Sequence, residues 1–186
     1  FVETQRPRVA TPLWTGEHYR HDKPRIAYMS ADFREHPVGR CIVELIERHD
    51  RSRFEITGIS LVPDEQSALA ERIRAGFDHY VEVTEKTDLE IARLIREREI
   101  DIVVDLMGHT ERARTRVFFH RPAPINVSYL GFPGTTGGSL MDYIVGDAFV
   151  IPEDHECHYD ERVVRLPDSY FVGDSTIRPS EITPSR

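Results

Sequence analysis

The sequence of 186 residues has little cysteine and no long apolar run. Cys41 and Cys157 are its only two cysteines, too few for a disulfide framework, so we expect a reducing, cytoplasmic compartment and a buried, unreactive Cys41. No apolar run approaches the roughly 20 residues of a membrane-spanning helix, and the first residues lack the apolar core of a signal peptide. These absences argue against a disulfide-stapled scaffold and predict no membrane partner.

Positive charge is also scarce. The formal net charge of −8 argues against nucleic acid as a partner, because a phosphate backbone attracts basic surfaces. Lys23 and Lys86 are the only lysines, and all other basic side chains apart from histidine are arginine. Arginine favours bidentate contacts to carboxylate or phosphate groups, although genomic base composition is an alternative cause of this bias.

Apolar runs and helical patterns alternate along the chain. We expect strands over residues 25–30, 54–62, 79–83, 102–105, 125–130, 143–145 and 163–166, and helices over 37–49, from the turn at 63–66 to about 76, over 88–99 and around 112–119. Such alternation predicts an α/β fold, Rossmann-like, with a largely parallel sheet and flanking helices. Residues 1–24 are expected to be a lead-in segment, 25–173 the folded unit and 174–186 a linker.

The first strand is followed by an acid and a histidine in the stretch Ser30-Ala31-Asp32-Phe33-Arg34-Glu35-His36-Pro37-Val38-Gly39. Strand, loop and helix in this order place Asp32 and His36 at the carboxyl end of a strand, where open α/β sheets bind ligands. Pro37 suits the first helical turn, and free N–H groups after it would favour an anion. Alternatively, Asp32 caps the turn and His36 is an ordinary loop histidine.

A second acid, Asp105, ends the strand at 102–105 and is followed by Gly108 and His109. These residues form a plausible wall of a site, or else Asp105 or Thr110 caps the next helix. Arg112, Arg114 and Arg116 alternate within that expected helix, so they cannot share one face.

Four glycines follow the strand at 125–130, within Leu130-Gly131-Phe132-Pro133-Gly134-Thr135-Thr136-Gly137-Gly138. Glycines allow a close backbone approach to a ligand, but the pattern is neither the dinucleotide fingerprint nor the lysine-bearing phosphate loop, and a turn without a ligand is an equal alternative. The cluster from His155 to Asp160 has metal-ligating residue types without a zinc spacing, so we expect a polar loop and no metal.

Three of these segments together resemble the catalytic region of the protein O-linked N-acetylglucosamine transferase family, including its bacterial and SPINDLY-like relatives. They are SADFREHPVG, DLMGHTERAR and RPAPINVSYLGFPGTTGGSLMDYIVGD, and the resemblance runs from about Arg25 to Gly173. It implies one Rossmann-like half, the N-terminal one, of a GT-B glycosyltransferase. In the parent protein, tetratricopeptide repeats would lie upstream and the other catalytic half downstream.

The resemblance also implies roles for individual residues. Asp32 matches a position near the reacting centre, and the donor-binding positions are His36, Pro37, Val38, Leu130 and Gly131. Arg114 and His109 match positions on the acceptor side, although animal enzymes have tyrosine in place of His109 and threonine in place of Val38. A histidine proposed as base in those enzymes lies in the segment upstream of Arg25, and whether it matches His18 or His21 stays open.

The implied reaction transfers N-acetylglucosamine from UDP-GlcNAc to Ser or Thr hydroxyls of a protein or peptide acceptor, with no metal or other cofactor. Three alternatives stay open at this point. One is a GDP-fucose-dependent protein O-fucosyltransferase of the SPINDLY type, and another is a nucleotide-sugar epimerase-like protein of GT-B fold. The third is a half-domain that is inactive on its own.

Overall fold

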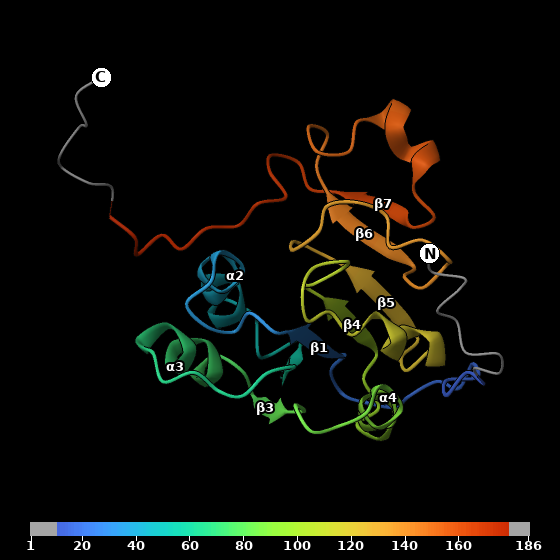
Figure 1. Cartoon of the computed structure of the whole chain (residues 1–186), viewed down its shortest axis with the longest axis horizontal. Coiled ribbons are helices and arrows are strands. Elements are labelled where there is room, and N and C mark those ends of the chain that lie inside the picture. The colour runs from blue at the N-terminus through green and yellow to red at the C-terminus, as the bar shows by residue number, and fades with distance from the viewer. Residues whose placement is uncertain (1–10, 179–186) are drawn as a thin grey trace.

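One parallel sheet organises the protein, seen in a computed structural model that describes residues 11–178 (Figure 1). Residues 1–10 of the expected lead-in and 179–186 of the expected linker lie outside that range. The strands are β1 (Arg25–Ser30), β2 (Glu55–Ser60), β3 (His79–Glu82), β4 (Ile102–Asp105), β5 (Ile125–Ser128), β6 (Tyr143–Gly146) and β7 (Arg162–Arg165). All neighbouring pairs are parallel, in the order β3-β2-β1-β4-β5-β6-β7.

Helices cover both faces of the sheet. They are α2 (Pro37–Glu47), α3 (Ala68–Ala75), α4 (Asp88–Glu97) and the 3₁₀ helices η1 (Thr115–His120) and η2 (Glu153–His158). Side chains alternate along β1, so Ile26 and Tyr28 pack with α2 and α3 in one apolar cluster, whereas Ala27 and Met29 pack with α4 and η1 in another. The predicted α/β class with a parallel sheet is therefore confirmed.

The strand order creates a switch point beside β1. From β1 the chain moves outward through β2 and β3, and it then returns to place β4 on the opposite side of β1. The loops after β1 and β4 therefore leave the same edge of the sheet in opposite directions, which opens a crevice between them. Both predicted acid-bearing loops begin there.

The helix expected at 112–119 is the main error in the predicted elements. Arg112 adopts a left-handed φ of 66°, and only Thr115–His120 is helical, as the 3₁₀ helix η1. Among the described residues no side chain caps this helix, and arginines lie at its start, where the helix dipole disfavours positive charge. Smaller differences affect the ends of elements: α2 stops at Glu47, α4 at Glu97 and β5 at Ser128.

The flanking segments are attached to this core. Leu13 N–H donates to His120 O at 2.7 Å, which ties the described part of the lead-in to η1. After β7, the C-terminal strap (residues 166–178) runs across α2 (Figure 1). Arg72 on α3 pairs with Asp174 at 2.5 Å, and this hydrogen bond lowers the pKa of the Asp174 carboxyl. Within residues 11–178, no helix is both long and apolar enough to cross a bilayer.

Candidate active site

The loop after β1 places three charged or polar side chains together. Asp32 is buried, and its backbone N–H donates to Ser30 Oγ at 2.9 Å. Arg34 Nη2 donates to Asp32 Oδ1 at 3.2 Å, while His36 Nδ1 lies 3.5 Å from Asp32 Oδ2. Asp32 and His36 thus meet, as the sequence predicted, and Arg34 joins them.

His36 is the N-cap of α2. Its Nδ1 accepts a hydrogen bond from the Val38 N–H at 3.2 Å, so Nδ1 carries a lone pair and the proton of the neutral ring is assigned to Nε2. The ring can then donate Nε2–H to a ligand. The expectation of free N–H groups at this helix start was wrong for Val38, because its N–H already donates to the His36 ring.

Gly39 fixes how closely α2 approaches the Asp32 loop. A Cβ at this position would lie 2.4 Å from Arg34 O and 2.8 Å from Asp32 O. Real Cβ atoms essentially never come closer than 3.0 Å to another heavy atom, so only glycine fits without a shift. The first turn of α2 therefore braces the backbone that carries Asp32.

Asp105, at the end of β4, supports a turn rather than lining the crevice. Its carboxylate accepts the N–H groups of Met107 at 3.3 Å and Gly108 at 2.9 Å. Burial raises the pKa of Asp105 to about 7, against an ordinary 3.8. No helix begins at this point, so neither Asp105 nor Thr110 is a helix cap; Thr110 Oγ1 instead donates to Met107 O at 3.0 Å.

The backbone after β5 enters the crevice at Leu130 and Gly131, both with left-handed φ values of 55° and 45°. This turn explains why β5 ends before Leu130. A Cβ on Gly131 would lie 2.2 Å from Leu106 O, so the β5 loop packs directly on the backbone after β4. The glycine predicted to allow close approach is thus needed for packing within the protein.

A buried carboxylate from the loop before β7 holds the rest of the glycine-rich loop. Glu161 accepts hydrogen bonds from Thr135 Oγ1 at 2.7 Å and from Thr136 N and Oγ1 at 2.7 and 2.5 Å. His109 Nε2 contacts Thr136 O at 2.9 Å on the other side. His109 therefore joins the β4 and β5 loops. Glu161 was not predicted from the sequence, because nothing near residue 161 marks it as a partner of the glycine-rich loop.

Two cavities adjoin each other at this edge. One, of about 160 Å³, is lined by Asp32, Arg34, His36, Val38, Thr110, Glu111, Arg112 and Gly131. The other, of about 230 Å³, is lined by His36, Pro37, Val38, Cys41, Leu130, Gly131, Tyr170 and Phe171. They share His36, Val38 and Gly131, and together we call them the crevice. It brings together the predicted catalytic position and the predicted donor-binding positions.

The two predicted acceptor-side residues, Arg114 and His109, do not line the crevice. Arg114 Nε donates to Asp88 Oδ1 at 2.5 Å and its Nη2 to Lys86 O at 2.9 Å, which holds the side chain at the start of α4. Arg112, from the same segment, lines the crevice instead. His21 contacts Glu99 O at 3.1 Å, close to the amino ends of β1 and β4 and therefore at the opposite edge of the sheet.

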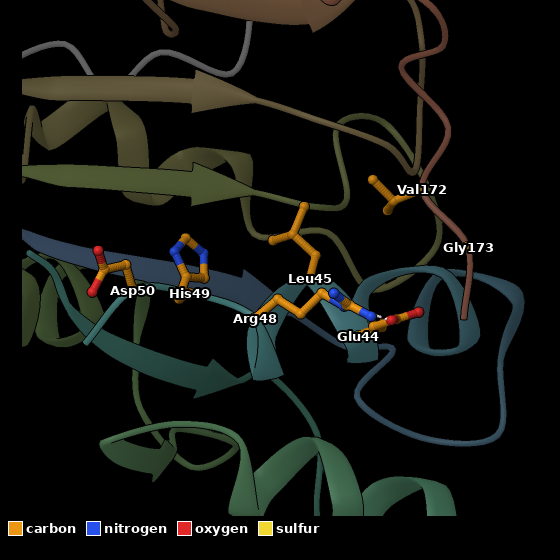
Figure 2. A pocket seen from close by; sticks show the side chains of 7 residues that line it. All are labelled: Glu44, Leu45, Arg48, His49, Asp50, Val172 and Gly173. Carbon is orange, nitrogen blue, oxygen red and sulfur yellow. Dashed lines mark hydrogen bonds and ion pairs between the residues drawn. The ribbon is translucent and has the colours of Figure 1, made fainter. Parts of the chain in front are cut away.

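A larger cavity of about 530 Å³ lies between α2 and the C-terminal strap (Figure 2). It is lined by Glu44, Leu45, Arg48, His49, Asp50, Val172 and Gly173, none of them a predicted site residue. Ser175 N and Oγ both donate to the Glu44 carboxylate, at 2.5 and 2.8 Å, and the Ser175 amide is the main cause that lowers the pKa of Glu44. This carboxylate therefore fastens the strap to α2.

The acidic and histidine-rich cluster was expected to be a polar loop, but most of it forms the 3₁₀ helix η2. The His155 and His158 rings meet edge to face at 6.0 Å, and Glu156 pairs with Arg165. Among the residues that the structure describes, no three His, Cys, Asp or Glu side chains are grouped so as to hold a metal ion. Cys41 is buried, as predicted, and burial raises the pKa of its thiol.

A family model described as glycosyl transferase family 41 matches residues 12–179. The chain belongs to this family. A curated relative from Arabidopsis thaliana, named a probable UDP-N-acetylglucosamine–peptide N-acetylglucosaminyltransferase SEC, is 38% identical over 150 residues, which cover 81% of this chain and 15% of the relative. A Caenorhabditis elegans UDP-N-acetylglucosamine–peptide N-acetylglucosaminyltransferase is 32% identical over 151 residues, covering 81% and 13%.

A solved structure of a mutant Thermobaculum terrenum O-GlcNAc transferase is also similar. It matches with a TM-score of 0.77 and 41% sequence identity, over 81% of this chain and 29% of that chain. The family resemblance and the Rossmann-like half of a GT-B fold are thereby confirmed. The chain spans only 13–15% of the length of the two curated relatives.

Proposed function

We propose that this chain is the N-terminal catalytic half of a glycosyltransferase that moves N-acetylglucosamine from UDP-GlcNAc to Ser or Thr hydroxyls of proteins. The observation that carries the proposal is the convergence of Asp32, His36 and Gly131 on one crevice at the switch point of the sheet, in a family 41 chain. Crevices at such points are where α/β proteins bind nucleotide ligands.

In this reaction the bond between the sugar C1 and the diphosphate oxygen breaks, and a bond from C1 to the acceptor oxygen forms. The hydroxyl proton must leave as attack proceeds, and a carboxylate at the reacting centre can relay it or orient the hydroxyl. We assign this role to Asp32. His36 is suited to donor contact, since its Nε2–H can donate to an oxygen of the nucleotide sugar.

The remaining crevice residues suit the sugar itself. Pro37, Val38 and Leu130 give apolar walls, and the exposed Gly131 brings backbone into the same space. Val38 has no hydroxyl, so its contact with the donor would be purely apolar. The acceptor would enter over the loop at 109–114, which includes His109 and Arg114.

We place the remaining donor contacts on a C-terminal catalytic half and propose tetratricopeptide repeats upstream in the parent protein. The isolated chain is therefore expected to be inactive and to bind UDP weakly. The cytoplasm is the proposed compartment, which Cys41 and Cys157 support as free thiols.

The test is intact-protein mass spectrometry with the full-length parent protein and a lysate from its own cell. Separate incubations receive UDP-GlcNAc and GDP-fucose, and free sugar products are analysed in parallel. A gain of one N-acetylhexosamine on protein acceptors, seen only with UDP-GlcNAc, supports the proposal. A gain only with GDP-fucose, or a free sugar isomer without modified protein, contradicts it.

A further inference from the structure

Arg34 makes the one hydrogen bond to the Asp32 carboxylate within the described range 11–178. Its Nη2 donates to Asp32 Oδ1 at 3.2 Å, while its Nε donates to Ala31 O at 3.2 Å. Two contacts from one rigid, planar guanidinium hold both the carboxylate and the loop backbone. Arg34 was not among the residues predicted from the sequence.

His36 does not provide this support in the neutral form. Its Nδ1, the atom closest to Asp32 Oδ2 at 3.5 Å, already accepts the Val38 N–H and has no proton to give. Arg34 therefore holds the carboxylate through Oδ1, while Oδ2 faces the His36 ring without a hydrogen bond from it.

Burial makes the support from Arg34 necessary. The Asp32 side chain is 10% exposed and the Arg34 side chain 30%, and both line the same cavity. A buried carboxylate without a partner is costly, so the loop would rearrange or draw in water if the guanidinium were lost. Either change would turn the carboxylate away from its present direction.

We propose that Arg34 is a positioning residue, which acts through Asp32 by fixing the direction of the carboxylate toward the reacting sugar. This inference rests on the proposed function and extends it to a residue outside the predicted site. It differs from direct diphosphate binding, the other role open to an arginine in a nucleotide-sugar crevice, because Nε and Nη2 of Arg34 already donate to Ala31 O and Asp32 Oδ1.

The test compares Arg34→Gln, Arg34→Lys and Asp32→Asn, with the Arg34→Gln/Asp32→Asn double variant, in the full-length parent protein. Arg40→Gln is the matched control, since Arg40 pairs with Glu35 at 2.8 Å in the same segment but is 62% exposed. Circular dichroism melts report folding, and kcat and KM for UDP-GlcNAc are measured with a peptide acceptor.

We expect Arg34→Gln to lower kcat on the order of 10- to 100-fold with little change in KM, as for a misplaced catalytic group. Arg34→Lys keeps the charge but loses the planar guanidinium that donates to two acceptors, so its kcat should be intermediate. If Arg34→Gln does not fold, Arg34→Lys supplies the same comparison. The double variant should be no slower than Asp32→Asn alone, because residues that act as a unit are not additive. Arg40→Gln should match the wild type.

Three results would overturn the proposal. Additive losses in the double variant, or a raised KM with unchanged kcat, would show that Arg34 binds ligand independently of Asp32. If folded Arg34→Gln has the wild-type kcat while Asp32→Asn is slow, Arg34 has no positioning role, but the proposed function still stands. Wild-type kcat in folded Asp32→Asn removes both.

Discussion

Replacing Gly39 by alanine should displace the loop that carries Asp32 while leaving the protein folded. The added Cβ would lie 2.4 Å from Arg34 O, and it needs at least 3.0 Å, so this carbonyl must retreat by about 0.6 Å. The Asp32 carbonyl, at 2.8 Å, must also move. Because both atoms belong to the loop backbone, no side-chain rotation can relieve the contacts.

The effects on stability and on catalysis should separate. Overpacking costs about 1–3 kcal/mol, whereas alanine is about 1 kcal/mol better than glycine within a helix, so the free energy of unfolding should fall by about 0–2 kcal/mol. Catalysis has no such compensation. A displacement of this size at a reacting group should lower kcat on the order of 10-fold or more.

The assay measures kcat and KM for UDP-GlcNAc in the full-length protein, alongside urea unfolding. Gly173→Ala is the matched control, since a Cβ at Gly173 meets no atom of residues 11–178 within 4 Å. It should keep wild-type kcat and stability. Wild-type kcat in Gly39→Ala would refute the reasoning, because the Asp32 loop would then tolerate the shift.

Three further predictions concern the support of the crevice. Gly131→Ala should destabilise the protein by about 1–3 kcal/mol, since its Cβ would meet Leu106 O at 2.2 Å, and unchanged urea unfolding would contradict this. The raised pKa of Asp105 gives a stability contribution that is full below pH 3.8 and lost as the pH rises through about 7. As the pH rises from 4 to 8, the free energy of unfolding of Asp105→Asn should therefore increase by up to about 4 kcal/mol relative to that of the wild type. The same pH dependence of unfolding in both proteins would contradict this prediction. Glu44→Ala removes the acceptor of both Ser175 hydrogen bonds, so amide exchange in residues 174–176 should accelerate while β1 stays protected; equal protection of the strap in both proteins would contradict its attachment through Glu44.

Most of the fold follows from local patterns. The buried strands β1 and β4 contain short apolar runs, and α4 has apolar residues at helical spacing after Thr87, which forms a capping box with Glu90. Helix ends were less predictable, because the last turns of α2 and α4 carry charged residues that fit a helix or a loop equally well. The helix expected at 112–119 was not fully formed, because Arg112 is left-handed and only Thr115–His120 is helical.

The proximity of site residues was predicted only where those residues are close in the sequence. Asp32, His36 and Pro37 lie within one strand–loop–helix unit, so their proximity follows from the order of elements. Contacts between distant segments were not visible. The ion pair of Arg114 with Asp88 and the hydrogen bonds of Glu161 with Thr136 depend on how loops fold against each other, and one sequence contains no sign of such partners.

The measurement that tests the central claim most directly is the turnover of Asp32→Asn in the full-length protein at saturating UDP-GlcNAc. The substitution keeps the size of the side chain and an oxygen for Arg34, but it removes the charge and the basicity. We predict that kcat falls on the order of 100-fold, as for loss of a proton-handling group, with the protein folded and the KM for donor nearly unchanged. Wild-type turnover from folded Asp32→Asn would show that the crevice at the end of β1 does not hold the reacting centre.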